Sequence, residues 1–197
     1  MSTHPQKAKA VVIYGASSEN IADNFKSEVF RLGQLLAKGD YSVVSGGGKA
    51  GLMRAAIEGA ASVGGETIGV LPEFMIKRDW QHPSLSRMIV TDGMHERKRT
   101  MAELSCGAVA CPGGCGTLEE LLEIITWRQL GLFTGNVVIL NIDHYYDPLL
   151  EMLQRTIDMG FMHPDHASLW CVATNAEEAY EAVTAEVTHI DFSQKIH

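Results

Sequence analysis

Short runs of apolar, mostly β-branched residues alternate along this chain with longer stretches in which apolar residues recur every three or four positions. The short runs predict strands and the longer stretches predict amphipathic helices. The seven predicted strands are 10–14, 41–45, 66–71, 87–91, 107–111, 136–142 and 169–173. The six predicted helices are 21–38, 52–62, 94–105, 117–130, 148–159 and 176–187. Residues 72–86 are less regular and predict a loop with one helical turn.

Strands and helices therefore alternate after a polar N-terminal tail, residues 1–9, which we expect to be disordered. Nearly continuous apolar strands are typical of a parallel sheet that is covered by helices on both faces. The pattern predicts an α/β fold, a doubly wound, Rossmann-like domain over residues 10–190 with a mainly parallel sheet of about seven strands. A chain of 197 residues has the usual length of one domain.

The charge balance narrows the choice of partners. The chain has 16 basic and 24 acidic residues, a net charge of −8, so there is no overall positive field to attract nucleic acid or anionic lipid. No apolar run is long enough to span a membrane, and the first one is too short for a signal peptide. We expect a cytoplasmic protein without nucleic-acid or membrane partners.

Three predicted strands end in small residues, at 15–18, 45–48 and 112–117. Because the carboxyl ends of parallel strands share one edge of a sheet, these turns are expected to meet there. Glycine allows close backbone approach, and free amides at a following helix N-terminus attract anions. The turns therefore predict a phosphate pocket, with Ser17 and Gly47 contributed by the first two of them.

The sequence fits two common nucleotide-binding motifs, the GxGxxG fingerprint and Walker A, only in part. Gly46, Gly48 and Gly51 fit GxGxxG, but they follow the second strand, and two further glycine turns imply a wider pocket than NAD requires. Lys49 is followed by Ala50 where a Walker A motif needs a hydroxyl residue for magnesium. We therefore expect that the protein neither binds NAD nor hydrolyses ATP, and that it needs no cofactor.

Cysteine spacing gives little support for a metal site. Cys106, Cys111 and Cys115 lie close together, but they form no CxxC pair, and Cys171 is far along the chain. Structural zinc sites usually show tighter paired spacing. No metal is expected.

Arg97 is the first candidate for catalysis. In MHERKRTMAELS it lies in the middle of the helical face formed by Met94, Met101 and Leu104. A buried arginine needs an anion, which a phosphate or an internal glutamate could supply. Its neighbour Lys98 is expected to be a solvated charge.

Glu120 is the second candidate, and it has a structural alternative. Thr117 and Glu120 have the spacing of a capping box, in which Glu120 would only cap the helix start. The helix 117–130 is apolar on nearly all sides, so it is expected to be buried both against the sheet and against another helix. A homodimer interface is the economical explanation.

Three segments together, SGGGKAGLM (45–53), MHERK (94–98) and PGGCGTLEE (112–120), resemble the LONELY GUY family of nucleotide phosphoribohydrolases. That resemblance covers about residues 10–187 and implies a dimeric Rossmann-like enzyme. It would cleave the N-glycosidic bond of a cytokinin riboside 5′-monophosphate or of AMP, giving the free base and ribose 5-phosphate. Many members have carried the older label lysine decarboxylase. That chemistry would need a pyridoxal phosphate lysine, and only Lys49 sits near a glycine turn, where lysines commonly just reach solvent. We therefore do not expect a decarboxylase.

The resemblance also implies roles for individual residues. Arg97 and Glu120 would be the catalytic pair, and the phosphate loop would comprise Gly113, Gly114, Cys115, Gly116 and Thr117. Lys98, Thr126 and Asp79 would also line the site. Asp79 stands where the family more often has glutamate, and Ala16 stands where Gly-Ser-Ser is usual.

The amides of 114–117 are expected to hold the phosphate. Because a carboxylate would repel phosphate, we assign Glu120 to the ribose. There it could bind hydroxyls, order water and stabilise an oxocarbenium-like transition state. Arg97 would contact either the base or the phosphate. The alternative is a non-catalytic nucleotide-binding protein of the same fold, since fold alone does not imply chemistry.

Overall fold

A computed structural model describes residues 9–187 of the chain. Its seven strands are β1 (Ala10–Tyr14), β2 (Ser42–Ser45), β3 (Thr67–Pro72), β4 (Arg87–Thr91), β5 (Gly107–Ala110), β6 (Asn136–Leu140) and β7 (Cys171–Ala173). They form one sheet in the order β4-β3-β2-β1-β5-β6-β7, and every neighbouring pair is parallel. The predicted α/β fold with a seven-stranded parallel sheet is confirmed.

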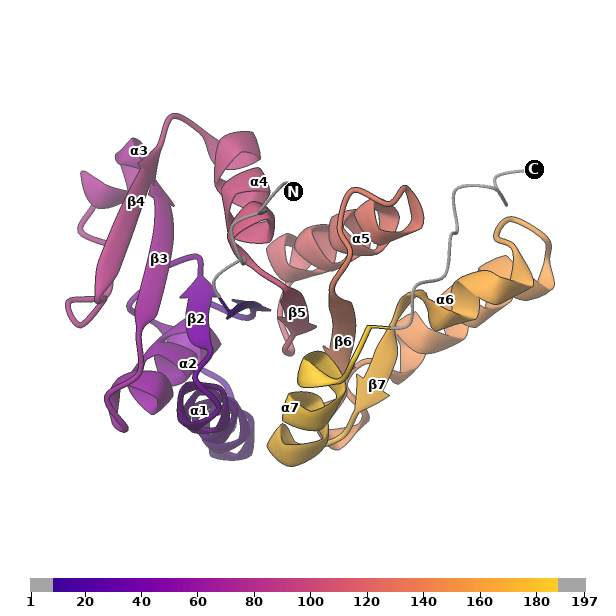
Figure 1. The fold of residues 1–197 in the computed structure, drawn as a ribbon, viewed down its shortest axis with the longest axis horizontal. Helices are drawn as coiled ribbons and strands as arrows, with labels where there is room; N and C mark the ends of the chain where they lie inside the picture. The colour runs from indigo at the N-terminus through magenta and orange to yellow at the C-terminus, as the bar shows by residue number, and fades with distance from the viewer. Residues whose placement is uncertain (1–8, 188–197) are drawn as a thin grey trace, which may run out of the picture.

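Helices cover both faces of the sheet (Figure 1). The α-helices are α1 (Asp23–Lys38), α2 (Gly51–Ala61), α3 (Glu73–Ile76), α4 (Met94–Leu104), α5 (Cys115–Gln129), α6 (Asp147–Asp158) and α7 (Ala176–Thr184). Two 3-10 helices, η1 (Ile142–His144) and η2 (Pro164–Leu169), complete the elements. A helical connection precedes every strand after β1, as the alternating pattern predicts.

The two faces of β1 contribute to two separate cores. Val11 and Ile13 pack with α1, α2 and α7, whereas Val12 and Tyr14 pack with α4 and α5. All of these side chains are buried, because both faces of the central strand are covered. The core therefore fixes α5 and α2 on opposite faces of the same strand.

Some element ends differ from the predicted ones. The predicted strand 169–173 begins only at Cys171, because Pro164 starts a 3-10 helix that includes Leu169. The predicted helix 176–187 ends at Thr184, and Ala185 is extended. The helical turn expected within 72–86 is α3, Glu73–Ile76. Residues 1–8 of the predicted tail, and residues 188–190 of the predicted domain, lie outside the described residues.

The chain runs outward in both directions from the middle of the sheet, from β1 through β2 to β4 and from β5 to β7. The loops that follow β1 and β5 therefore diverge, one toward α1 and the other toward α5. Ligands of open α/β sheets bind at such a switch point, beyond the carboxyl ends of the strands. Within the described part of the chain, no helix combines the length and the apolar character that crossing a membrane requires.

Candidate active site

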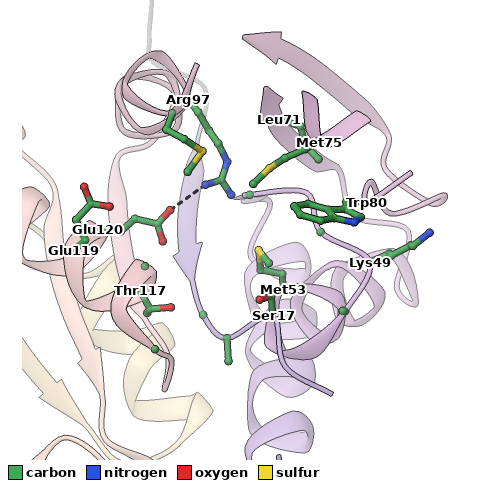
Figure 2. Close-up of a pocket in the computed structure, with 18 residues that line it drawn as sticks. Ser17, Lys49, Met53, Leu71, Met75, Trp80, Arg97, Thr117, Glu119 and Glu120 are labelled. Atoms are coloured by element: carbon green, nitrogen blue, oxygen red, sulfur yellow. Dashed lines mark hydrogen bonds and ion pairs between the residues drawn. The ribbon is translucent and has the colours of Figure 1, made fainter. Parts of the chain in front are cut away.

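A pocket of about 520 Å³ lies at this switch point. All three glycine turns predicted from the sequence contribute to its walls, together with α2, α3, α4 and α5 (Figure 2). The lining residues are Gly15, Ala16, Ser17, Gly46, Gly48, Lys49, Ala50, Met53, Leu71, Met75, Trp80, Met94, Arg97, Gly114, Gly116, Thr117, Glu119 and Glu120. A cavity of this size has room for a nucleotide-sized ligand.

The start of α5 forms one end of the pocket. Gly114 is the N-cap, and Gly114, Cys115 and Gly116 are exposed. A Cβ atom added at Gly114 or Gly116 would meet no atom within 4 Å, so the backbone here is open to a ligand. The first amides of a helix have no acceptor within it and carry the positive end of its dipole. This end of the pocket is suited to an anion such as phosphate.

Two tyrosines between η1 and α6 hold the loop before α5 from behind. The hydroxyl of Tyr145 donates to the carbonyl oxygen of Gly113 at 2.6 Å, and that of Tyr146 donates to the carbonyl oxygen of Cys111 at 2.7 Å. Tyr146 is almost completely buried, and Tyr145 packs edge-on against Phe25. The phosphate-binding end is thus attached to rigid elements rather than carried on a free loop.

Arg97 extends from α4 across the top of the sheet to the pocket (Figure 2). Its Nε donates to the carbonyl oxygen of Val70 at 3.0 Å, and its Nη1 lies 3.4 Å from Oε1 of Glu120. Only 6% of the residue is exposed. Gly46 passes directly beneath the guanidinium, where any Cβ would collide with Nη2. The glycine at 46 is therefore required by the arginine that packs on it.

Glu120 is held in the same buried region. Burial raises the pKa of its carboxyl group from 4.5 to about 7; Arg97 opposes this rise, and the nearby Glu119 adds to it. Burial likewise lowers the pKa of the Arg97 guanidinium, against the effect of Glu120. A carboxyl group with a pKa near 7 can both bind and release a proton at neutral pH. Shifts of this kind in a pocket are typical of catalytic groups.

The capping-box alternative for Glu120 is wrong. The helix begins at Cys115 rather than at Thr117, its N-cap is Gly114, and no side chain caps it. Thr117 is the third residue inside the helix, so Glu120 lies one turn further in and reaches Arg97 instead. The internal ion pair expected as an alternative for Arg97 is present, but it faces the pocket.

A second charged cluster lies beside this pair. Nζ of Lys98 donates to Oε1 of Glu119 at 2.7 Å and to Oε1 of Glu123 at 3.3 Å. The expectation that Lys98 is solvated is wrong: only 6% of it is exposed, because α4 and α5 pack against each other there. Burial lowers the pKa of Lys98, but its bonds to the two glutamates outweigh this effect and raise it. Tyr14 lies in the same region. Burial is the main cause that raises the pKa of its hydroxyl group, and the charges of Glu120 and Glu123 raise it further.

The predicted site residues fall into two groups. Ser17, Gly114, Gly116, Thr117, Arg97 and Glu120 share the pocket wall. Outside that wall are Gly47, Gly113, Cys115, Lys98, Thr126 and Asp79. Asp79 is exposed and forms an ion pair with Lys49 Nζ at 2.5 Å. Thr126 is exposed on α5, and its hydroxyl donates to the carbonyl oxygen of Leu122.

Sequence reasoning missed the apolar side of the pocket, formed by Met53, Leu71, Met75, Trp80 and Met94. Three of these are methionines, which are adaptable in packing. Trp80 and Met75 belong to the irregular segment 72–86, where periodicity does not indicate which side chains turn inward. The available signal was the single tryptophan within the polar run KRDWQH.

Comparison with known proteins identifies the family of this chain. A family model described as "Possible lysine decarboxylase" matches residues 53–183. The cytokinin riboside 5′-monophosphate phosphoribohydrolase LOG5 of Arabidopsis thaliana is 34% identical over 177 residues, 90% of this chain and 78% of that protein. LOG2 of the same plant is 30% identical over 197 residues, 100% of this chain and 92% of that protein.

Solved structures share the fold. The Moco carrier protein of Chlamydomonas reinhardtii is 27% identical with a TM-score of 0.69, over 89% of this chain and 94% of that one. The molybdenum cofactor binding protein of Rippkaea orientalis, 22% identical with a TM-score of 0.68 over 90% and 96% of the two chains, shows the fold alone. The resemblance inferred from three sequence motifs is confirmed by these relatives, which match most of the chain. The chain belongs to the family of the cytokinin riboside 5′-monophosphate phosphoribohydrolases, whose family model bears the description of a possible lysine decarboxylase.

Proposed function

We propose that this protein hydrolyses the N-glycosidic bond of a nucleoside 5′-monophosphate, either AMP or a cytokinin riboside 5′-monophosphate, to the free base and ribose 5-phosphate. The buried Arg97–Glu120 pair beside an open helix N-terminus carries the proposal. Simple nucleotide binding does not need a carboxyl group with a pKa near 7 in the pocket. The activity for which the plant relatives are named supports the same reaction.

The lining of the pocket suggests how the nucleotide lies. Its phosphate would accept hydrogen bonds from the amides at the start of α5 and from the Thr117 hydroxyl. Its ribose would lie one turn further along, against Glu120. The base would occupy the apolar side near Met75 and Trp80, on the opposite side of the pocket from Thr117 (Figure 2).

The reaction then consumes one water molecule. Water adds to C1′ of the ribose and its proton passes to the ionised carboxylate of Glu120. The electron pair of the C1′–N9 bond leaves with the base, which takes a proton from solvent to become neutral, and Glu120 then releases its proton to solvent. The carboxylate also stabilises the positive charge that develops on the ribose ring. Arg97 fixes the carboxylate and presents donors to the departing base or to the phosphate.

The test is a panel of AMP, N6-isopentenyl-AMP, GMP and CMP, incubated with the protein and analysed by chromatography for free base. We expect base and ribose 5-phosphate from at least one adenine nucleotide. Adenosine, which lacks the phosphate, should be a poor substrate because the anion site supplies the positioning. Binding of AMP with no base released at high protein concentration would instead favour the non-catalytic alternative.

We also propose that two chains associate through the outer side of α5. The helix is apolar on nearly all sides, and its outer side leaves Leu122 and Leu130 43% and 45% exposed. A second chain would cover these side chains. Light scattering should give about twice the mass of the 21.5 kDa chain. Leu122→Asp should shift the protein toward monomer and lower its activity, because the same helix carries Glu120.

Val63→Asp is the matched control, since Val63 is 38% exposed just beyond α2, on the other face of the sheet. It should leave the mass unchanged. A wild-type protein of one-chain mass at micromolar concentration would contradict the dimer. The cytoplasmic location expected from the sequence stays a prediction.

A further inference from the structure

Trp80 offers an exposed aromatic ring to the pocket on a backbone that cannot move freely. The ring lines the pocket and the residue is 43% exposed. The amide of Lys49 donates to the carbonyl oxygen of Trp80 at 3.0 Å, and the amide of His82 donates to that of Gly47 at 2.8 Å. Both bonds join the segment around Trp80 to the glycine turn after β2. The tryptophan is therefore placed by the main chain, although little protein covers its side chain.

Arg78 supports the ring from outside the pocket. Its Cζ lies 5.2 Å from the centre of the Trp80 ring and 5.9 Å from that of Phe74, and Arg78 does not line the pocket. A guanidinium over one face of an indole is a favourable cation–π contact. The guanidinium therefore covers one face of the indole. The ring surface that remains for a ligand is the one that borders the pocket.

The surroundings of Trp80 favour a flat, apolar ligand. Met75 and Leu71 lie on the same side of the pocket, and Met53 lies below the ring (Figure 2). The neighbouring cation, Lys49, is paired with Asp79 at 2.5 Å. The backbone amides and the buried carboxyl group lie at the opposite end, by Thr117 and Glu120. A ligand with a charged group at one end and an aromatic ring at the other matches this division.

We propose that Trp80 is the base-binding residue of the pocket: its indole, backed by Arg78, stacks on the heterocycle of the bound nucleotide. The identity of that ligand rests on the proposed function. Stacking recognises the flat face of the base and not its hydrogen-bonding edge. The site therefore accepts purines with different substituents and binds ribose 5-phosphate without help from Trp80.

Affinities are measured by isothermal titration calorimetry, and contact with the ring by tryptophan fluorescence, both in Glu120→Gln, which keeps the nucleotide intact during the titration. AMP should quench the fluorescence, and ribose 5-phosphate, which has no base, should bind without quenching. Adding Trp80→Leu should abolish the quenching and weaken AMP binding about tenfold or more, the scale of a lost base–aromatic stack. Trp80→Phe should restore most of the affinity. Affinity for ribose 5-phosphate should stay the same in all of these variants.

Phe74→Leu is the matched control, because Phe74 is also 43% exposed and also contacts Arg78 but does not line the pocket. It should leave AMP affinity unchanged. Equal AMP affinity in Trp80→Leu and its parent, or an equal loss for ribose 5-phosphate, would overturn the stacking role. Quenching by AMP without hydrolysis in the wild-type protein would overturn the proposed function and leave the stacking role standing. Hydrolysis without quenching would do the reverse, and a protein that binds no AMP would overturn both.

Discussion

Glu120→Gln is expected to reduce the turnover of nucleotide by about a hundredfold or more, the scale for removing a preorganised charge that acts on the transition state. Glutamine keeps the size of the side chain and can still accept a hydrogen bond from Arg97 Nη1, which lies 3.4 Å from Oε1. It cannot take a proton from water or carry the negative charge that faces the developing cation. Steady-state kcat with AMP, compared with wild type, is the measurement.

Glu123→Gln is the matched control on the same helix. Glu123 contacts Lys98 at 3.3 Å and does not line the pocket, so its loss should change kcat only a few-fold. Full activity of Glu120→Gln would remove the carboxylate from the mechanism. A similar loss in both variants would mean that the acidic cluster acts by holding α4 against α5.

The raised pKa of Glu120 adds a pH signature to this result. Because the ionised form is needed, wild-type kcat should rise with pH through about 7, and Glu120→Gln should lack that limb. Stability should show the opposite trend. The folded pKa lies above the ordinary value of 4.5, so the stability contributed by the protonated group is complete below pH 4.5 and is lost as pH rises through about 7. The melting temperature of Glu120→Gln relative to wild type should therefore increase from pH 5 to pH 8.

The fold was predictable because its determinants are local. Apolar runs such as Val11–Ile13 and Val137–Leu140 are bounded by small or polar residues, and their continuity indicates strands buried on both faces. Element ends were less predictable where two local signals compete. Leu169 has the apolar character of a strand residue, but Pro164 begins a 3-10 helix five residues earlier and the strand starts later.

The glycine turns of the candidate site were predictable from the strand ends, and a helical side chain was predictable where it conflicts with its own element. Arg97 was found because a guanidinium on an apolar helical stripe needs an anion. Lys98 gave no such conflict, and its burial arises from the contact between α4 and α5, which the pattern of one helix does not contain. Trp80 lies in a segment without periodicity, so its approach to the glycine turn depends on backbone bonds between distant residues.

Arg97→Met should lower kcat by a similar hundredfold or more and, unlike Glu120→Gln, should move the pH profile. Methionine fills much of the same buried space but leaves the carboxyl group of Glu120 without its cationic partner. Since Arg97 opposes the effect of burial, the pKa of Glu120 should rise above its value of about 7. The remaining activity should therefore appear at higher pH than in wild type.

Arg99→Met provides the control for this variant, because Arg99 lies on the same helix but its side chain is 63% exposed and 3.9 Å from Glu103. Exposed pairs of this kind contribute little to stability, so both activity and melting temperature should stay near wild type. A pH profile of Arg97→Met that coincides with wild type, at any level of activity, would show that the guanidinium does not set the ionisation of Glu120. An acid limb shifted upward, with Arg99→Met unchanged, would identify Arg97 and Glu120 as one coupled unit at the reacting bond.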